Sequence, residues 1–365
     1  MKPIADNPSV SGFAVSIIRD GEVKYMKGFG LADEANNRNY THQTTQNTAS
    51  ISKTFIGVSL MKAQAMNLLD LDDSIDKYLP YKIINPRFPN EVITIRHLAS
   101  HTSSLKDPDE YEKSYIFEEK INFAPSMKPK FVHKMAAGYN TNTRVGLDEF
   151  IKSIFHPSGE YYSKKNFLKV GPGKKYAYSN IGAGMAARII EEASGKSFVE
   201  FTQEHIFDPL QMNSSTWELK KADRNLKAVP YIRPGVPLPQ YDLITFADGG
   251  LITSVEDLSK YVLEMMNCYL GKGTILTEAQ AKEMMTPYLK NAEEKYGIFW
   301  EISSSGKSIG HNGGDPGTST NMYFIPTIGV AKIMFTNSPP IDKAGGEALS
   351  NVWGTIRAYE LKVEK

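Results

Sequence analysis

The sequence predicts an α/β fold of the α+β kind, with an antiparallel sheet assembled from both ends of the chain and a mainly helical domain inserted in the middle. Strand-like patterns cluster near residues 12–30 and 296–337, and helix-like patterns lie between them. The length of 365 residues also exceeds what one ordinary hydrophobic core accommodates, so two domains are expected.

Turn and capping residues indicate where the individual elements begin and end. Asp20-Gly21 separates two apolar segments and predicts a β-hairpin. Thr94 and Ser254 are typical helix N-caps, and Gly195 is a C-cap signal. We therefore expect helices at residues 50–67, 94–101, 147–155, 181–194, from 254 onward and at 351–361, and strands at 12–18, 23–28, 296–302, 307–311, 319–325 and 330–336.

These elements divide the chain into two predicted domains. Residues 1–68 and 246–365 form a discontinuous sheet domain, and residues 69–245 form a mainly helical domain. The helical part contains an extended insert at about 106–170, rich in Lys, Tyr, Phe and Pro. We expect the active site to lie between the two domains.

Composition excludes several classes of function. Forty-two basic and 41 acidic residues give a net charge of +1, which provides no general attraction to nucleic acid or to an anionic membrane. The apolar runs are too short to cross a bilayer, and no apolar leader follows Met1. We expect a cytoplasmic protein, or a periplasmic or cell-envelope protein if an export signal has been removed. Cys268 is the only cysteine, so neither an intrachain disulfide nor a cysteine-based metal site is possible.

The tetrad Ser50-Ile51-Ser52-Lys53 opens a predicted helix and is the most informative motif. Residues three apart on a helix lie on one face, so the Ser50 hydroxyl and the Lys53 amine can meet. A serine hydroxyl becomes an effective nucleophile when a neighbouring base takes its proton. The alternative is a helix N-cap serine followed by a surface lysine.

Two further segments offer groups suited to the same chemistry. Tyr178 and Asn180 precede the predicted helix at 181–194, where a phenol can relay a proton and an amide can hold a carbonyl. The glycine-rich segment that begins at His311 follows a predicted strand, and a backbone N–H at a strand edge can complete an oxyanion hole.

In order and spacing, Ser50-x-x-Lys53, Tyr178-x-Asn180 and His311-x-Gly313 resemble the motifs of the active-site serine penicillin-recognising hydrolases. This family includes class C β-lactamases, low-molecular-weight DD-peptidases, D-aminopeptidases and related esterases. Other segments that look like family landmarks are 69–80, 95–103, 247–251 and 296–300, and together with the motifs they cover nearly the whole chain. The resemblance implies a β-lactamase/transpeptidase-like fold with an antiparallel sheet of about five or more strands.

The resemblance also implies the role of each motif residue. Ser50 would be the acylated nucleophile, and Lys53 and Tyr178 the proton-transfer pair, with either of them as the base. Asn180, His311 and Gly313 would bind substrate, and the backbone N–H groups of Ser50 and Gly314 would form the oxyanion hole. The family mechanism needs no metal and no cofactor. The expected partner is a small-molecule or peptide substrate, and the oligomeric state is left open.

Two departures from the family pattern affect the expected specificity. Many relatives carry a lysine in the third motif, where it helps to hold the substrate's carboxylate, whereas this chain has His311. A protonated His311 could still hold an anionic group, while a neutral His311 would be a hydrogen-bond partner for Tyr178 or the substrate. The segment 105–175 also looks long for the family, and it either shapes specificity or forms a surface subdomain.

The most favoured function is therefore a serine acyl hydrolase that works through an acyl-enzyme. DD-peptidase-like or D-amino-acid peptidase activity ranks above a carboxylesterase, and β-lactamase activity is expected to be weak. The alternative class is a catalytically silent peptidoglycan- or peptide-binding protein on the same fold. His97 and His101 have the spacing of a zinc site, but no Glu lies between them and a structural role is favoured.

Overall fold

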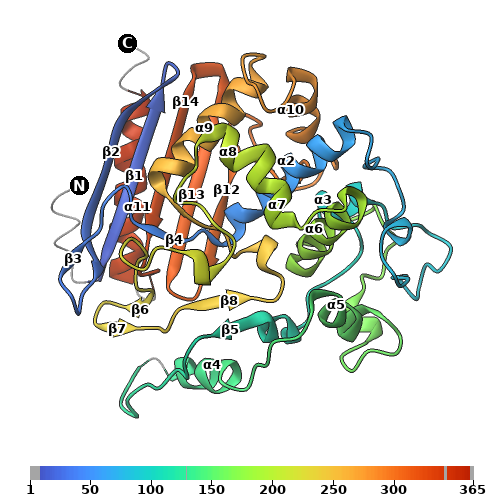
Figure 1. The fold of residues 1–365 in the computed structure, drawn as a ribbon, viewed down its shortest axis with the longest axis horizontal. Coiled ribbons are helices and arrows are strands. Elements are labelled where there is room, and N and C mark those ends of the chain that lie inside the picture. Colours follow the sequence, from blue (N-terminus) through green and yellow to red (C-terminus); the bar gives the residue numbers. More distant parts are fainter. Residues whose placement is uncertain (1–8, 129, 341–342, 362–365) are drawn as a thin grey trace.

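An eight-stranded antiparallel sheet dominates the computed structural model, which describes residues 9–128, 130–340 and 343–361. The strands lie in the order β10-β11-β12-β13-β14-β1-β2-β3, so both ends of the chain contribute to one sheet (Figure 1). Their bounds are β1 (Gly12–Arg19), β2 (Glu22–Asp33), β3 (Arg38–Asn39), β10 (Lys295–Tyr296), β11 (Glu301–Ile302), β12 (Ile309–Asp315), β13 (Thr318–Ile325) and β14 (Val330–Thr336). The predicted fold class is confirmed. Residues 1–8, on which the argument about an export signal depended, lie outside the described residues.

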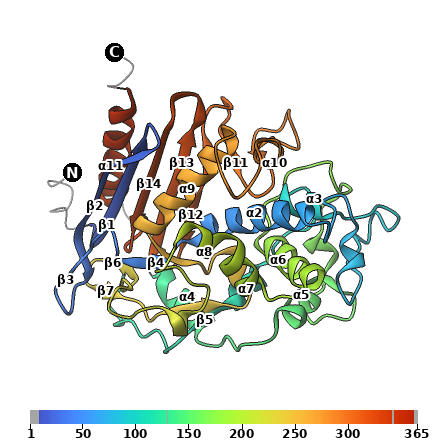
Figure 2. The same cartoon turned by 45° about the horizontal axis from the view of Figure 1, so that its top comes forward.

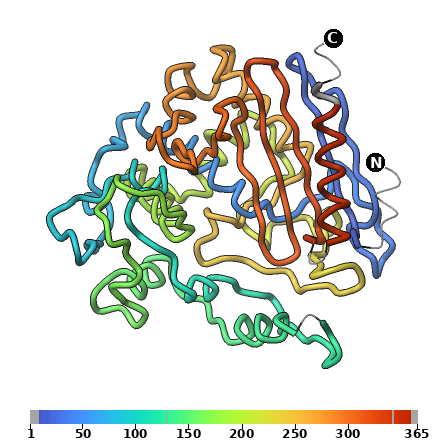
Figure 3. The backbone as a smooth tube through the Cα atoms, turned by 180° about the vertical axis from the view of Figure 1, so that it is seen from behind, coloured from blue at the N-terminus to red at the C-terminus, as the bar shows by residue number. Residues whose placement is uncertain are grey.

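Strands β1 and β14, which are neighbours inside the sheet, are buried along almost their whole length. β1 pairs with β14, and both carry mainly apolar and β-branched residues that suit a sheet covered on two sides. Helix α9 (Val255–Tyr269) lies against one face, and α11 (Lys343–Leu361) lies against the opposite face, as the view from behind shows (Figure 3). The second face has its own apolar cluster, which includes Phe13 and Val15 of β1 and Leu349 and Val352 of α11.

The hairpin between β1 and β2 forms where the sequence predicted it. Asp20 has φ of 53° and Gly21 has φ of 77°, and two successive residues with positive φ are typical of a two-residue hairpin turn that matches strand twist. This turn fixes the register in which Arg19 faces Glu22.

The remaining helices and short strands complete the fold. The helices are α2 (Ser52–Ala65), α3 (Ile95–Ala99), α4 (Phe131–Tyr139), α5 (Leu147–Phe155), α6 (Asn180–Ser194), α7 (Phe198–Thr202), α8 (Asp208–Leu210) and α10 (Glu278–Met284). The short strands are β4 (Thr45–Asn47), β5 (Tyr115–Phe117), β6 (Tyr231–Arg233), β7 (Val236–Pro237), β8 (Tyr241–Leu243) and β9 (Ile252–Ser254). Helix α2 extends from the sheet into the group formed by α3, α5, α6 and α7 (Figure 2).

Capping predictions are confirmed at three helices. Thr94 accepts a hydrogen bond from the backbone of His97, and Ser254 accepts one from Asp257. Gly195 ends α6 with a left-handed backbone, φ 68°, which glycine adopts without a steric penalty.

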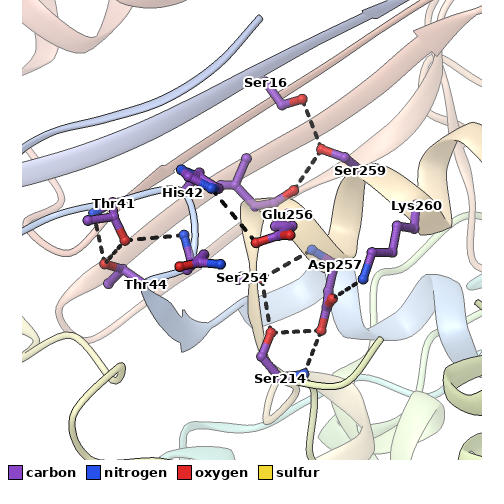
Figure 4. A network of polar contacts seen from close by, with 12 residues as sticks. Ser16, Thr41, His42, Thr44, Ser214, Ser254, Glu256, Asp257, Ser259 and Lys260 are labelled. Atoms are coloured by element: carbon purple, nitrogen blue, oxygen red, sulfur yellow. Dashed lines mark hydrogen bonds and ion pairs between the residues drawn. The ribbon is translucent and has the colours of Figure 1, made fainter. Parts of the chain in front are cut away.

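A polar network fixes the start of α9 between the sheet and the loop at 213–216 (Figure 4). The Asp257 carboxylate accepts hydrogen bonds from Ser214 N at 2.8 Å and from Lys260 Nζ at 2.8 Å. Ser259 Oγ donates to Ser16 Oγ of β1 at 2.9 Å. The helix is therefore held to strand β1 by a buried hydrogen bond as well as by apolar contacts.

Two expectations about local structure are wrong. The segment 296–302 is not one strand, because Phe299 has φ of 58° and separates β10 from β11. The insert at 106–170 holds more regular structure than its composition indicated, since α4 and β5 accompany the predicted helix at 147–155. Strand β5 pairs with β8, a long-range contact that no local pattern could reveal.

Candidate active site

Ser50 lies in a short 3-10 turn, η1 (Ala49–Ile51), that leads directly into α2. Ala49 has φ of 49°, a left-handed conformation that an alanine adopts only when its surroundings impose it. Thr320 Oγ1 of β13 donates to Thr48 O at 2.7 Å, and Thr48 N donates to Leu251 O at 2.8 Å. Hydrogen bonds from distant segments thus hold Ser50 in a strained turn.

Lys53 follows one helical turn later and is fully buried. Its Nζ lies 3.0 Å from Ser50 Oγ, 2.7 Å from Asn180 Oδ1 and 2.7 Å from Asp248 O. Burial acts to lower the pKa of Lys53, but Tyr178 and the nearby carboxylates outweigh it and the net pKa is raised. Three oxygen acceptors match the three donors of an ammonium, so the resting state of Lys53 is charged.

Tyr178 presents its phenol beside this lysine. Lys53 Nζ lies 5.0 Å from the Tyr178 ring centroid, and the Tyr178 hydroxyl is buried without a hydrogen-bond partner among residues 9–128, 130–340 and 343–361. Burial raises the pKa of Tyr178, while Lys53 and the nearby Ser50 hydroxyl act in the opposite direction. The ring of His101 packs against Tyr178 with the ring centroids 4.2 Å apart. A buried hydroxyl without a partner is costly, and here it faces the site in which a substrate would bind.

Asn180 is the first residue of α6, and a carboxylate from another segment fixes it. Asp107 accepts hydrogen bonds from Ser179 Oγ at 2.6 Å, from Asn180 N at 2.5 Å and from Ile181 N at 3.3 Å. Burial raises the pKa of Asp107, and these hydrogen bonds oppose that rise. A carboxylate at a helix N-terminus is favourable because the exposed N–H groups carry partial positive charge. Sequence analysis missed Asp107 because it lies more than 70 residues before α6.

The third motif belongs to β12, and the surroundings of His311, Gly313 and the adjacent Gly314 differ. His311 is only 2% exposed, and its Nδ1 donates to Asn312 O at 2.5 Å. Burial lowers the pKa of His311 to about 3, so the ring is neutral at physiological pH. The structure therefore supports the neutral alternative and not an anion-binding charge. Gly313 packs on the turn that carries Ser50, since a Cβ there would lie 2.4 Å from Thr48 O, whereas Gly314 borders open space.

A cavity of about 580 Å³ joins most of these groups. Of the residues singled out from the sequence, it brings together Ser50, Tyr178, Asn180, His311 and Gly314. Its other lining residues, which sequence analysis did not assign to the site, are Tyr111, Glu112, Tyr115, Asp248, Gly249, Tyr296, Asn312 and Asp315. The two aspartates lie in segments that the sequence analysis singled out, 247–251 and the glycine-rich segment that begins at His311, but it assigned no role to either carboxylate.

The structural role of the two histidines in the zinc-like spacing is evident from their partners. His97 Nδ1 accepts from Thr94 N as part of a capping box, and His101 Nδ1 accepts from Ser179 N. Within the described part of the chain, no group of three or more His, Cys, Asp or Glu side chains could hold a metal ion. Nor does any helix in those segments combine the length and apolarity needed to span a bilayer.

Comparisons with known proteins place this chain in a family. The profile described as Beta-lactamase matches residues 1–353. The chain is 24% identical to protein flp of Staphylococcus aureus over 308 residues, 83% of this chain and 55% of the relative. It is 25% identical to penicillin-binding protein 4* of Bacillus subtilis over 324 residues, 83% of this chain and 62% of the relative. The chain thus spans little more than half the length of these curated relatives.

Solved structures give the same result for the fold. An octameric penicillin-binding protein homologue from Pyrococcus abyssi superimposes with a TM-score of 0.70 at 26% identity, over 94% of this chain and 74% of that chain. A β-lactamase/D-alanine carboxypeptidase from Yersinia pestis gives a TM-score of 0.70 at 18% identity, over 98% and 95% of the two chains. With a family profile that covers nearly all its residues, the chain belongs to the beta-lactamase family.

Proposed function

We propose that this protein hydrolyses amide bonds through an acyl-enzyme on Ser50, with Lys53 and Tyr178 as the proton-transfer pair. Activity of the DD-peptidase or D-amino-acid peptidase type, or of the β-lactamase type, fits this machinery, and ester hydrolysis uses the same steps. The observation that carries the proposal is the 3.0 Å contact between Lys53 Nζ and Ser50 Oγ beside a buried, unpartnered Tyr178 hydroxyl. A catalytically silent binding protein would not need to preserve this arrangement.

Each side chain has a defined task in the proposed reaction. The Ser50 proton passes to the Lys53–Tyr178 pair as Oγ bonds to the substrate carbonyl carbon. The backbone N–H groups of Ser50 and Gly314 stabilise the oxyanion. Because Asn180 directs Oδ1 at Lys53, its amide NH₂ is left to hold a substrate carbonyl. The pair then returns the proton to the leaving group, and water repeats the sequence to release the acid.

Since Lys53 and Tyr178 both have raised pKa values, the resting pair is an ammonium and a neutral phenol. The reacting state has one proton fewer than this resting state. Because Lys53 and Tyr178 titrate as a coupled pair, the proton that is lost comes from the pair and not from either residue alone. The Lys53 ammonium lies close enough to stabilise a phenolate, so we assign Tyr178 as the group that accepts the serine proton.

The site is proposed to lie between two domains, residues 1–68 with 246–365 and residues 69–245. Ser50 and His311 come from the first and Tyr178 and Asn180 from the second. The cavity that all four residues line supports this division.

Active-site labelling tests the proposal. A fluorophosphonate should add to the protein once, and peptide mapping should locate the adduct on Ser50. Ser50→Ala should abolish labelling and turnover. Ser52→Ala is the matched control, because the Ser52 hydroxyl bonds Thr48 Oγ1 and Leu251 N in the interior. Labelling of another serine, or unchanged turnover in Ser50→Ala, would refute the assignment.

A substrate panel then separates the reaction types. Peptides ending in D-Ala-D-Ala, D-amino-acid amides, a cephalosporin and a nitrophenyl ester report on the four activities. We expect amide substrates to be turned over and the cephalosporin to be the poorest. Hydrolysis of the ester alone would assign the protein as a carboxylesterase.

A further inference from the structure

A cluster of acids and phenols forms part of the cavity that contains Ser50. The Tyr111 hydroxyl lies 3.1 Å and 3.2 Å from the two oxygens of the Asp248 carboxylate. The Tyr115 hydroxyl donates to Asp315 Oδ1 at 2.5 Å. Asp248 comes from the turn before β9, Asp315 from the end of β12, and the two tyrosines from the insert. Two segments therefore bring carboxylates to the cavity of the nucleophile, and a third supplies the phenols that contact them.

The protein balances the charge of this cluster only in part, because the Lys53 ammonium acts on both Asp248 and Asp315. Within the described ranges, no Lys, Arg or His forms an ion pair with Asp248 or Asp315. The Lys53 ammonium is directed at three oxygens that belong to neither carboxylate. Glu112, which also lines the cavity, adds another acid. Asp248 is buried and Asp315 is partly buried. Carboxylates withdrawn from water are unstable in the charged form unless cations balance them, and one ammonium faces more than one acid here, so the site has room for a further positive charge.

A second observation points to an N–H donor in the same place. Because His311 uses its Nδ1 proton on Asn312 O, its Nε2 is an acceptor, and this buried atom has no partner in the described chain. His311 lines the cavity with the two aspartates. A ligand that brings both positive charge and N–H groups would satisfy the carboxylates and the histidine together.

We propose that the cavity recognises an ammonium group of the substrate through Asp248 and Asp315. The ammonium can be a free α-amine or a basic side chain, since both have the same chemistry. This inference rests on the proposed function and narrows it towards amine-bearing peptides, amides or esters. A substrate whose only charged groups are carboxylates is disfavoured, because Asp248 and Asp315 would repel it.

The groups that face the two acids set their protonation. Hydrogen bonds from Tyr111 and Tyr115 and the charge of Lys53 oppose the rise in these pKa values. Asp107 acts on Asp248 to increase it, and Asp248 and Glu112 act on Asp315 to increase it. Burial is the main cause, and the pKa values of Asp248 and Asp315 are each raised to about 7. A bound cation favours the ionised carboxylates, so its affinity should increase as pH rises through about 7 and fall when the amine itself loses its proton, at about 8 for an α-amine.

Matched substrates test the inference directly. The set comprises alanine anilide with a free amine, its N-acetyl derivative, and N-acetyl-lysine anilide, each as D and L enantiomers. In the wild type we expect kcat/KM for the cationic members to exceed that of the neutral N-acetyl-alanine anilide by about tenfold or more. A faster N-acetyl-lysine than free-amine substrate would identify the basic side chain as the source of the charge. Equal values throughout would overturn the inference.

Two substitutions test whether the carboxylates of Asp248 and Asp315 recognise the ammonium group. Asp315→Asn retains an acceptor for Tyr115 while removing the charge, and it should reduce the cation preference to within about threefold of unity. Asp248→Asn provides the same test if the first variant does not fold. Glu22→Gln, which removes an exposed charge in β2, is the control and should leave the preference intact. An unchanged preference in both cavity variants would overturn the inference.

Binding without turnover separates this inference from the proposed function. D-Alaninamide and N-acetyl-D-alaninamide are titrated calorimetrically into the Ser50→Ala variant, which cannot turn them over, at pH 6 and pH 7.5. Tighter binding of the free amine, stronger at pH 7.5, supports ammonium recognition even if Ser50 cannot be labelled. Equal binding overturns it even if labelling succeeds.

Discussion

Two buried lysines in this protein have opposite acid–base properties. Lys53 is fully buried and Lys227 is 3% exposed, so their desolvation is similar. Lys53 has three oxygen acceptors and several acidic neighbours, and its pKa is raised. Lys227 donates to Asn47 Oδ1 at 2.6 Å, and burial together with Arg224 lowers its pKa to about 7. The local supply of negative charge, and not burial, decides whether a buried amine stays protonated.

The largest expected effect comes from removing the lysine beside Ser50. Lys53→Met should reduce kcat/KM by about 10²–10⁴-fold, because the variant loses the charge that assists proton transfer. Lys227→Met is the matched control, since it replaces an equally buried amine outside the cavity and should keep activity. Steady-state kinetics on a neutral ester or amide measures both. If kcat/KM fell equally in the two variants, the acidic surroundings that distinguish Lys53 from Lys227 would have no role in catalysis.

The next effect concerns the carboxylate that positions the tyrosine and asparagine motif. Asp107→Asn removes the charge that accepts three hydrogen bonds at the start of α6. A small displacement of Asn180 would move an acceptor of Lys53, so kcat should fall by about tenfold to a hundredfold.

Asp148→Asn provides a control in the same half of the molecule, because Asp148 pairs with Arg188 away from the cavity. A change in KM alone, or an equal loss in the control variant, would contradict the positioning role of Asp107.

The pH dependence of kcat/KM in the wild type tests whether the pKa of Lys53 is raised while that of Lys227 is lowered. Because the pKa values of Lys53 and Tyr178 are raised, the pair gives up its proton only in alkaline solution. We therefore expect kcat/KM for a neutral substrate to rise continuously above pH 8. A plateau reached by pH 7 would mean that Lys53 loses its proton as readily as Lys227.

The smallest expected effect is on stability. The folded pKa of Lys227, about 7, lies below the value of about 10.4 in an unfolded chain. Between these values the unfolded state binds one more proton than the folded state, so stability should increase with pH from 7 to 10.4 and lose this dependence below 7.

Lys227→Met should remove that contribution and flatten the increase of melting temperature between pH 7 and pH 10. The measurement is a series of thermal melts of both proteins under matched salt conditions. Parallel curves for wild type and variant would show that the Lys227 pKa is not depressed.

The sequence by itself determined the elements whose causes are local. The hairpin at Asp20-Gly21 depends on two adjacent residues that tolerate positive φ, and the caps at Thr94, Ser254 and Gly195 act within a single turn. The Ser50–Lys53 contact belongs to the same class, because a spacing of three residues places both side chains on one helix face.

Tertiary structure alone decided which charges surround those residues. Asp107, Asp248 and Asp315 reach the site from segments separated by up to about two hundred residues, and no periodicity or cap connects them. His311 shows the consequence, since its sequence allowed a charged or a neutral ring and only its burial made it neutral. Local geometry can be inferred from neighbouring residues, whereas desolvation and long-range charge depend on how the whole chain packs.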